Sequence, residues 1–235
     1  MFQSKNAGSG SSRLARRLVT SLRTLGPTLL VGLAVACLAA VLFSWLASEM
    51  LEGETQAFDN AVRGFIHKGA RPLLTSMLGA VTLLGSTIVI IALSICAILV
   101  FVWLRMQHAA ILFAITMAGA FILNAALKLS FQRPRPDPYF DLTVPTSYSF
   151  PSGHAIYSFC FYGTLAALMT ARIHNHVVQV FIWLIAVLLI IMIGLSRVYL
   201  GVHYPSDVLG GYAASLVWVC TIALGDRLLH RKGEA

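Results

Sequence analysis

Charged side chains are scarce in this sequence. Asp, Glu, Lys and Arg make up 11% of its 235 residues, whereas 58% are hydrophobic, and the mean hydropathy is +0.81. A soluble globular domain carries about 25% charged residues, so the composition excludes an ordinary soluble protein. The chain is therefore expected to be a membrane protein, and its length requires only one domain.

Metal-binding and redox patterns are also missing. The four cysteines stand far apart inside apolar runs, and no pair has the CxxC spacing of a metal or redox motif. They are best explained as small buried hydrophobic residues. The nine acids form no carboxylate cluster suited to a divalent cation, and no segment repeats at a fixed period. We therefore expect no metal and no other cofactor.

The net charge of +8 is concentrated near the beginning of the chain. Five cations precede the first apolar run: Lys5, Arg13, Arg16, Arg17 and Arg23. Basic residues beside a membrane span orient it, with the basic side in the cytoplasm. This placement explains the charge without a nucleic-acid partner, and residues 1–25 are predicted to be a basic cytoplasmic segment.

The first apolar run, residues 27–48, is close to the ~20 residues that a helix needs to cross a bilayer. A cleaved signal is an alternative, because Ala34-Val35-Ala36 resembles a cleavage site and Cys37 could then carry a lipid. The run continues well past Ala36, however, whereas the apolar core of a signal peptide has about 7–15 residues. We therefore favour an uncleaved membrane helix.

A polar stretch, residues 49–71, follows this span. Its apolar side chains recur at helical spacing, and they are Phe58, Val62, Phe65 and Ile66. Such a pattern predicts an amphipathic helix that lies at the membrane interface.

The remaining apolar sequence contains five more crossings. Residues 72–104 are too many for one span, and Gly85-Ser86 divides them into an entering segment, 72–84, and a span, 86–104. The further spans are 108–130, 153–171, 177–196 and 207–226. The fold class is thus an all-α, six-span transmembrane helical bundle with an interfacial amphipathic helix after the first span. The membrane domain is expected to cover residues 26–226, with 227–235 as a cytoplasmic tail.

This arrangement predicts the side on which each loop lies. With the N-terminus inside, the inner segments hold ten of the 17 Lys and Arg residues but only two of the nine acids. Because cytoplasmic loops are rich in Lys and Arg, both termini are expected in the cytoplasm, with the protein in a bacterial plasma membrane. Three charged segments then share the outer side: KLSFQRPRP (128–136), FPSGH (150–154) and SRVYLGVHYPSD (196–207). Charges at membrane depth cost free energy, so this cluster marks a functional site.

His203 is the candidate nucleophile. Asp207 follows it by four residues, so the two side chains share one face if a helix starts between them, with Ser206 as its N-cap. The carboxylate would fix the imidazole tautomer and stabilise the imidazolium that forms when the other nitrogen attacks phosphorus. Taken alone, the pair is also explained by an interfacial histidine beside a capping aspartate.

A second histidine follows a predicted helix start. Ser152 is expected as the N-cap, and Gly153 leaves the backbone N–H groups open to an anion. His154, in the first turn, could donate a proton to a leaving group. A helix start with a solvent-facing histidine is the alternative for this segment.

Lys128, Arg135 and Arg197 supply three positive charges. Cations of this kind stabilise the oxygens of a phosphoryl group in the transition state without a metal. Lys128 and Arg197 could instead snorkel from helix ends. Arg133 and Arg135 alternate with prolines, which favour extended backbone, so the two side chains are expected to point in different directions and only one need reach the phosphate.

Together these segments resemble the three signature motifs of the type 2 phosphatidic acid phosphatase and vanadium haloperoxidase superfamily. The matching residues are Lys128, Arg135-Pro136, Pro151-Ser152-Gly153-His154, Ser196-Arg197, His203 and Asp207. The resemblance covers about residues 58–226. It implies that His203 is the nucleophile, Asp207 its orienting partner and His154 the acid. It assigns phosphate binding to Lys128, Arg135, Ser152, Gly153 and Arg197.

The resemblance implies an integral membrane lipid phosphatase that acts on the outer face. The six predicted spans agree with the membrane branch of the family and argue against its soluble acid phosphatases and vanadium-dependent peroxidases. Undecaprenyl diphosphate, phosphatidate and phosphatidylglycerophosphate are the candidate substrates, with a lipid A phosphate as a further option. The motifs read only the phosphate, so the lipid should be selected by residues 49–71 and the loop 137–150.

Two other functions remain open at this point. The same phosphohistidine could transfer a phosphoryl or phospholipid group to an acceptor instead of to water. A transporter or polar-lipid-binding protein could use the cations merely to hold an anion, but His203, Asp207 and His154 would then have no purpose. The sequence does not indicate the oligomeric state.

Overall fold

The computed structural model describes residues 8–140 and 146–233, and these residues form helices joined by loops. The elements are α1 (Gly8–Glu52), α2 (Thr55–Lys68), α3 (Pro72–Leu83), α4 (Thr87–Trp103), α5 (Gln107–Phe131), α6 (Gly153–Ser158), the π-helix η1 (Phe159–Gly163), α7 (Thr164–Thr170), α8 (His176–Tyr199) and α9 (Pro205–Gly233). The all-α prediction is confirmed over this part of the chain, which contains no strand.

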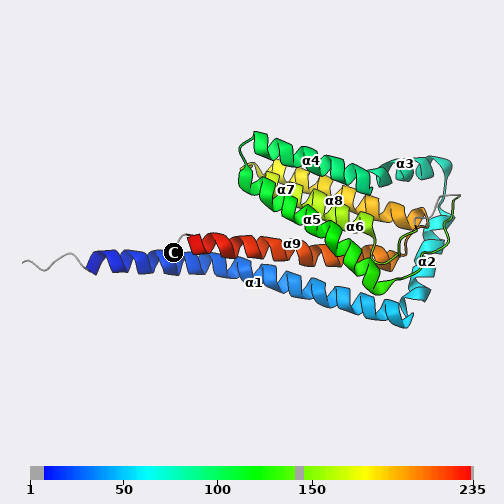
Figure 1. Ribbon diagram of the computed structural model, residues 1–235, viewed down its shortest axis with the longest axis horizontal. Helices are drawn as coiled ribbons and strands as arrows, with labels where there is room; N and C mark the ends of the chain where they lie inside the picture. Colours follow the sequence, from blue (N-terminus) through cyan, green and yellow to red (C-terminus); the bar gives the residue numbers. More distant parts are fainter. Residues whose placement is uncertain (1–7, 141–145, 234–235) are drawn as a thin grey trace, which may run out of the picture.

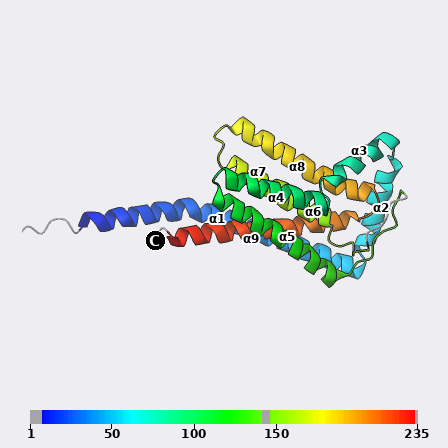
Figure 2. The ribbon, with the colours of Figure 1, turned by 45° about the horizontal axis from the view of Figure 1, so that its top comes forward.

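The helices pack into one elongated bundle. α1 and α9 lie side by side along one flank, and α4, α5 and α8 surround the continuous helical segment α6–η1–α7 (Figures 1 and 2). α2 crosses the end of the bundle that lies opposite the start of α1 and the end of α9 (Figure 1). The turn between α8 and α9 and the start of α6 lie at the same end as α2, so all three charged segments meet there.

The apolar runs of the sequence correspond to these helices. Four helices are long and apolar enough to cross a membrane: Leu29–Glu52 within α1, α5, α8, and Pro205–Leu229 within α9. α3 and α4 form a fifth, broken candidate, with a bend of 48° between them. The expected span 153–171 coincides with α6–η1–α7, which is helical but is divided by the π-helical turn. The count of six crossings therefore stays a prediction.

The expected outer limits of the domain do not coincide with helix ends. α1 already begins at Gly8, within the segment 1–25, and α9 continues through the expected tail to Gly233. The division at residues 25 and 226 stays a prediction. Residues 141–145 of the expected selectivity loop lie outside the described residues.

The predicted break at Gly85-Ser86 separates α3 from α4. A Cβ atom on Gly85 would meet the side chain of Ile193 and lie 3.2 Å from Cδ2 of His154. Glycine therefore lets this bend approach α6 closely, next to a predicted catalytic side chain.

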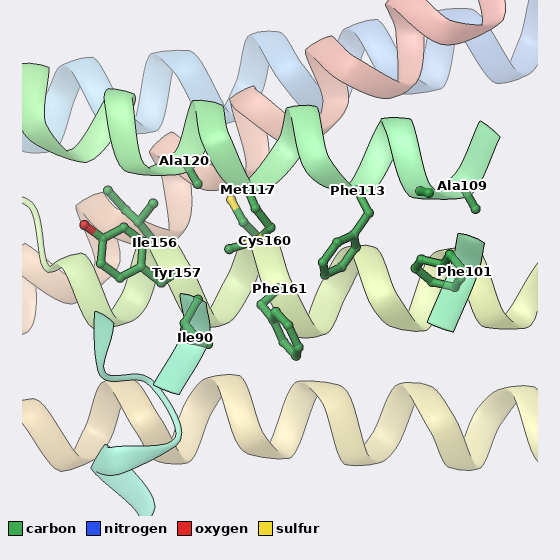
Figure 3. Close-up of a cluster of buried hydrophobic side chains, with 11 residues drawn as sticks. Ile90, Phe101, Ala109, Phe113, Met117, Ala120, Ile156, Tyr157, Cys160 and Phe161 are labelled. Atoms are coloured by element: carbon green, nitrogen blue, oxygen red, sulfur yellow. The ribbon is translucent and has the colours of Figure 1, made fainter. Parts of the chain in front are cut away.

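The main core lies where α4, α5 and the α6–η1 segment meet (Figure 3). Phe113 is fully buried at its centre and makes edge-to-face contacts with Phe101 and Phe161, at centroid distances of 5.9 and 5.5 Å. Cys160 is buried in the same cluster, as expected of a small hydrophobic residue. The expectation of burial is wrong for Cys37 and Cys96, which are exposed on the apolar outer surface, where lipid takes the place of a core.

The predicted amphipathic helix forms α2, but its charged face is the buried one. Asp59 and Arg63 point into the bundle, whereas the rings of Phe58 and Phe65 are 51% and 79% exposed. This orientation suits a helix at a membrane interface, where the apolar face meets lipid. It also brings two charges of α2 to the end of the bundle where the three motifs meet.

Candidate active site

Six of the eight predicted site residues line one cavity of about 260 Å³ at the α2 end of the bundle. They are Lys128, Arg135, Gly153, His154, Arg197 and His203, and the same walls contain Thr87, Asn124, Ser147 and Tyr157. The other two, Ser152 and Asp207, are fully buried directly behind this lining. Residues from three distant parts of the chain thus meet around a space large enough for a phosphate group.

His203 lies in the turn between α8 and α9 and is 2% exposed. Its Nδ1 lies 3.2 Å from Oδ2 of Asp207, one turn later in the first turn of α9. The same Oδ2 accepts hydrogen bonds from the backbone N–H of Tyr204, at 2.9 Å, and from the hydroxyl of Ser149. The carboxylate is therefore held against the imidazole from several directions. Ser206 is not the predicted N-cap, because α9 already begins at Pro205 and the Ser206 hydroxyl donates to Asp59 instead.

The second nitrogen of His203 faces the cations. Nε2 lies 3.1 Å from Nη1 of Arg135, which also donates to the carbonyl oxygen of Val202 at 2.9 Å. Burial lowers the pKa of His203 below its ordinary value, while the hydrogen bond and charge of Asp207 act in the opposite direction. A neutral imidazole that donates from Nδ1 to Asp207 leaves a lone pair on Nε2 at the cavity, which is the arrangement a nucleophile requires.

Three cations enter the cavity from different elements. Lys128, in the last turn of α5, donates to the carbonyl oxygens of Tyr148 and Ser149. Arg135 comes from the extended segment after α5 and donates to the carbonyl oxygen of Ser147 at 2.7 Å. Burial lowers the pKa of Arg135, and the negative charge of Asp207 partly offsets this decrease. Because the positive charges of Lys128, Arg135 and Arg197 line one cavity and repel one another, the cavity favours an anion with several oxygens.

Arg197 completes the set of cations at the end of α8. Its Nη1 donates to Oγ1 of Thr82 in α3 at 2.8 Å, while its buried Nε has no hydrogen-bond partner among the described residues. The guanidinium is thus fixed from behind and retains donor capacity toward the cavity. This geometry differs from the snorkelling alternative, in which the side chain would extend to the membrane surface.

The segment Ser152-Gly153-His154 forms the start of α6. The backbone N–H of Ser152 donates to the carbonyl oxygen of Asp207 at 3.0 Å, which ties this start to α9. Ser152 occupies the N-cap position, but its hydroxyl makes no capping bond and has no partner among the described residues. A Cβ on Gly153 would lie 3.2 Å from Oδ1 of Asn124, so a larger residue would force the Asn124 side chain to shift. His154 lines the same cavity as the cations.

Arg133 and Arg135 point in different directions, as the alternation with prolines predicts. Arg135 lines the cavity, whereas Arg133 turns inward to Oδ1 of Asp207, at 2.7 Å, and Oδ2 of Asp59, at 2.8 Å. Asp59 was not predicted to be part of the site. The sequence shows only that Asp59 is an acid on the polar face of an amphipathic helix, and such a position is ordinarily exposed to solvent.

A histidine–aspartate pair beside three cations, at one end of an apolar helical bundle, defines an integral membrane phosphatase. Residues 107–228 match the sequence profile of the PAP2 superfamily, and the chain belongs to this superfamily.

Known proteins agree with this assignment. Phosphatidylglycerophosphatase B of Bacillus subtilis (strain 168) is 29% identical over 194 residues, which cover 80% of this chain and 93% of that protein. Undecaprenyl-diphosphatase of Sulfolobus acidocaldarius is 29% identical over 119 residues, covering 48% of this chain and 53% of the relative. The crystal structure of a transmembrane PAP2 type phosphatidylglycerolphosphate phosphatase from Bacillus subtilis superposes with a TM-score of 0.76 at 26% identity. That superposition covers 82% of this chain and 96% of the other.

Proposed function

We propose that this protein hydrolyses lipid phosphates at the outer face of a bacterial plasma membrane, through a phosphohistidine on His203 and without a metal. The observation that carries the proposal is the position of the His203 ring, with Asp207 at Nδ1 and the cationic cavity at Nε2. The similarity to phosphatidylglycerophosphatase B over most of both chains supports phosphatidylglycerophosphate as the first candidate substrate. Phosphatidate and undecaprenyl diphosphate belong to the same chemical class.

In the first step, Nε2 of His203 attacks phosphorus and the bond from phosphorus to the leaving oxygen breaks. Lys128, Arg135 and Arg197 surround the phosphoryl oxygens as negative charge spreads over them. Asp207 accepts the Nδ1 hydrogen bond and stabilises the positive charge that develops on the ring. The products of this step are a phosphohistidine and the lipid that has lost one phosphoryl group: an alcohol from a monoester, or a lipid monophosphate from a diphosphate.

His154 is placed to give the leaving oxygen its proton. A bound phosphate brings negative charge into the cavity that His154 lines, and this charge favours the protonated imidazole that acts as the acid. In the second step His154 takes a proton from water, which attacks the phosphohistidine and releases inorganic phosphate. The nitrogen–phosphorus bond breaks and His203 returns to its starting state.

Phosphate release from the purified protein tests this function. The panel contains phosphatidylglycerophosphate, phosphatidate, undecaprenyl diphosphate and lipid A 1-phosphate in detergent micelles, each measured with and without EDTA. We expect metal-independent release from at least one lipid, and an acid-labile phosphoryl group on the protein after rapid alkaline quenching.

The variant His203→Ala supplies the control. It should lose phosphate release and the phosphoryl-protein together, while it still binds inorganic phosphate or vanadate at the cations. Unchanged turnover by His203→Ala, or anion binding by the wild type without hydrolysis of any lipid in the panel, would contradict the proposal. A group transferase would instead consume the lipid and deliver the phosphoryl group to an added acceptor.

A further inference from the structure

Asp59 and Arg133 form a buried ion pair behind the cavity. Nη2 of Arg133 lies 2.8 Å from Oδ2 of Asp59, and the side chains are 7% and 0% exposed. The pair joins α2 to the extended segment that follows α5. Neither residue lines the cavity, so neither is available to contact a phosphate there.

The pair also holds the first turn of α9. Asp59 accepts hydrogen bonds from the backbone N–H of Ser206, at 2.9 Å, and from its hydroxyl, at 2.6 Å. The same hydroxyl accepts a hydrogen bond from Nη1 of Arg133 at 2.8 Å. Asp59 and Arg133 therefore bind the residue directly before Asp207.

Arg133 bridges the two carboxylates directly. Its Nη1 donates to Oδ1 of Asp207 at 2.7 Å while Nη2 binds Asp59. A planar guanidinium can hold two carboxylates in fixed relative positions, which the single ammonium of a lysine cannot do as well. The face of the same guanidinium stacks over the ring of Tyr204, 4.0 Å from its centroid. The guanidinium of Arg133 is thus held by hydrogen bonds at its edge and by the Tyr204 ring at its face.

This bridge separates the tasks of the two oxygens of Asp207. Oδ1 binds Arg133, and Oδ2 faces Nδ1 of His203. Rotation of the carboxylate would break the contact with Arg133 and leave a buried cation only partly paired, which costs free energy. The orientation that serves His203 is therefore the one that the bridge stabilises.

Arg63, one turn after Asp59 on α2, holds the other side of the His203 turn. Its Nη2 donates to the carbonyl oxygen of Gly201 at 3.3 Å and to that of Asp137 at 2.7 Å. Gly201 has a φ of +76°, and a Cβ there would lie 2.6 Å from the backbone nitrogen of Tyr139. The buried face of α2 thus contacts the chain on both sides of His203, at Gly201 and at Ser206.

We propose that Asp59 and Arg133 are positioning residues for the nucleophile, and that they act by fixing the carboxylate of Asp207 toward His203. The inference rests on the proposed function, because it assumes that His203 attacks phosphorus. The two residues touch neither the substrate nor the reacting atoms. Their removal should lower kcat while it leaves the affinity for the phosphate largely unchanged.

The test compares Arg133→Gln in two backgrounds. In the wild type we expect kcat to fall ~10–100-fold, the size typical when a partner that orients a reactive group is removed, with KM within about 3-fold. In Asp207→Asn the group that Arg133 orients is already altered, so adding Arg133→Gln should cost less than about 3-fold. A soluble aryl phosphate with a good leaving group keeps the slow variants measurable.

Further variants separate positioning from folding. Asp59→Asn should behave like Arg133→Gln, and the double variant should be little worse than either one. Arg133→Lys should recover part of the lost kcat, because it keeps the charge. Arg172→Gln, at an exposed arginine in the turn after α7, is the matched control and should retain wild-type kcat.

Activity is expressed per mole of monodisperse protein from size exclusion, together with Tm. Equal losses from Arg133→Gln in both backgrounds, or a lower Tm with unchanged kcat, would overturn the positioning role. The proposed function is judged separately by His203→Ala, which loses turnover whether or not Asp59 and Arg133 matter. If His203→Ala keeps its activity, the proposed function is wrong. If His203→Ala is inactive but the Asp59 and Arg133 variants keep wild-type kcat, only the positioning role is wrong.

Discussion

His203 has a carboxylate at one ring nitrogen and a guanidinium at the other. Attack on phosphorus requires a neutral ring with a lone pair on Nε2. Burial disfavours the charged imidazolium and lowers the pKa of His203, with Asp207 opposing this effect and Arg135 and Arg197 adding to it. The neutral, reactive form should therefore persist at a pH well below ~6.5, the pKa of an ordinary histidine.

This state of His203 predicts the acid limb of the pH profile. Because kcat/KM rises as the nucleophile loses its proton and is level above that pKa, we expect no loss attributable to His203 between pH 7 and about 5. The second ionisation of the phosphate substrate, near pH 6 for a simple ester, must be measured and factored out. Asp207→Asn removes a group that raises the pKa of His203, so the acid limb should move still lower. An acid limb of kcat/KM near pH 6.5 that does not move in Asp207→Asn would contradict the assignment of His203 as the buried nucleophile.

His154 should matter in proportion to the leaving group. If it protonates the leaving oxygen, His154→Ala should slow an alkyl phosphate by ~100-fold or more and an aryl phosphate with an acidic phenol far less. Pre-steady-state formation of the phosphohistidine with both substrates measures this difference. Equal losses with both leaving groups would remove the acid role from His154.

Site residues could be predicted from the sequence where they stand in a short recognisable motif. A site residue outside any motif could not be predicted. The eight predicted site residues stand in short segments where charge, glycine or proline interrupts an apolar chain, and the structure gathers them around one cavity. Asp59 stands instead in a polar stretch, where an acid is ordinarily solvated. Its burial results from the docking of α2 against Arg133 and Ser206, which no local pattern encodes.

At the scale of elements, the bend between α3 and α4 connects membrane packing to the site. Gly85 allows α8 and α6 to approach the bend, since its missing Cβ would contact Ile193 and His154. Gly85→Ala should destabilise the protein by about 1–3 kcal/mol through overpacking. It should also lower kcat by ~10-fold, because a small displacement of a reacting group is costly.

Gly79→Ala provides the matched control in α3. No atom lies within 4 Å of the Cβ that it would add, so Tm and kcat should stay near those of the wild type or Tm should rise slightly. Thermal unfolding in detergent and phosphate release measure both variants. If Gly85→Ala equals Gly79→Ala in both, the close approach does not constrain His154.

Helix positions were largely predictable because a helix in a membrane must be a long apolar run. α4, α5 and α8 begin and end within three residues of the expected spans 86–104, 108–130 and 177–196. The π-helical turn η1 was not predicted, since it changes hydrogen bonding within a run whose composition is uniformly apolar. The direction in which α2 faces was also not predictable, because at an interface either face of an amphipathic helix can meet the protein.

At the scale of the whole molecule, the site depends on elements from both halves of the chain. α2, the end of α5 and the extended segment after it supply Asp59, Lys128 and two arginines. The start of α6, the end of α8, the turn after it and the start of α9 supply the remaining groups. Lys128, His154 and His203 can meet only if the helices that carry them open to the same side of the membrane. A topology that placed these residues on different sides of the membrane would therefore exclude the proposed chemistry.

The arrangement of the bundle supports the predicted topology. The described ends of the chain lie at one end of the bundle, and α2 lies at the other, as expected for an even number of crossings (Figure 1). The excess of Lys and Arg in the expected inner segments predicts that the termini lie in the cytoplasm. Asp137, beside the site, and His174, in the α7–α8 turn, are both exposed and should then lie on opposite sides of the membrane.

Cysteine labelling tests this topology in spheroplasts. The four free cysteines are first replaced, after which Asp137→Cys or His174→Cys is introduced and treated with a membrane-impermeant maleimide. We expect Asp137→Cys to react in intact spheroplasts and His174→Cys to react only after permeabilisation. The reverse pattern would move the cavity to the cytoplasmic face, and labelling of both sites in intact spheroplasts would mean that an even number of crossings, or none, separates them. The reverse pattern would contradict the outer-face site, because only lipid phosphates of the outer leaflet can reach a cavity that opens there, whereas labelling of both sites would contradict the predicted crossing at residues 153–171.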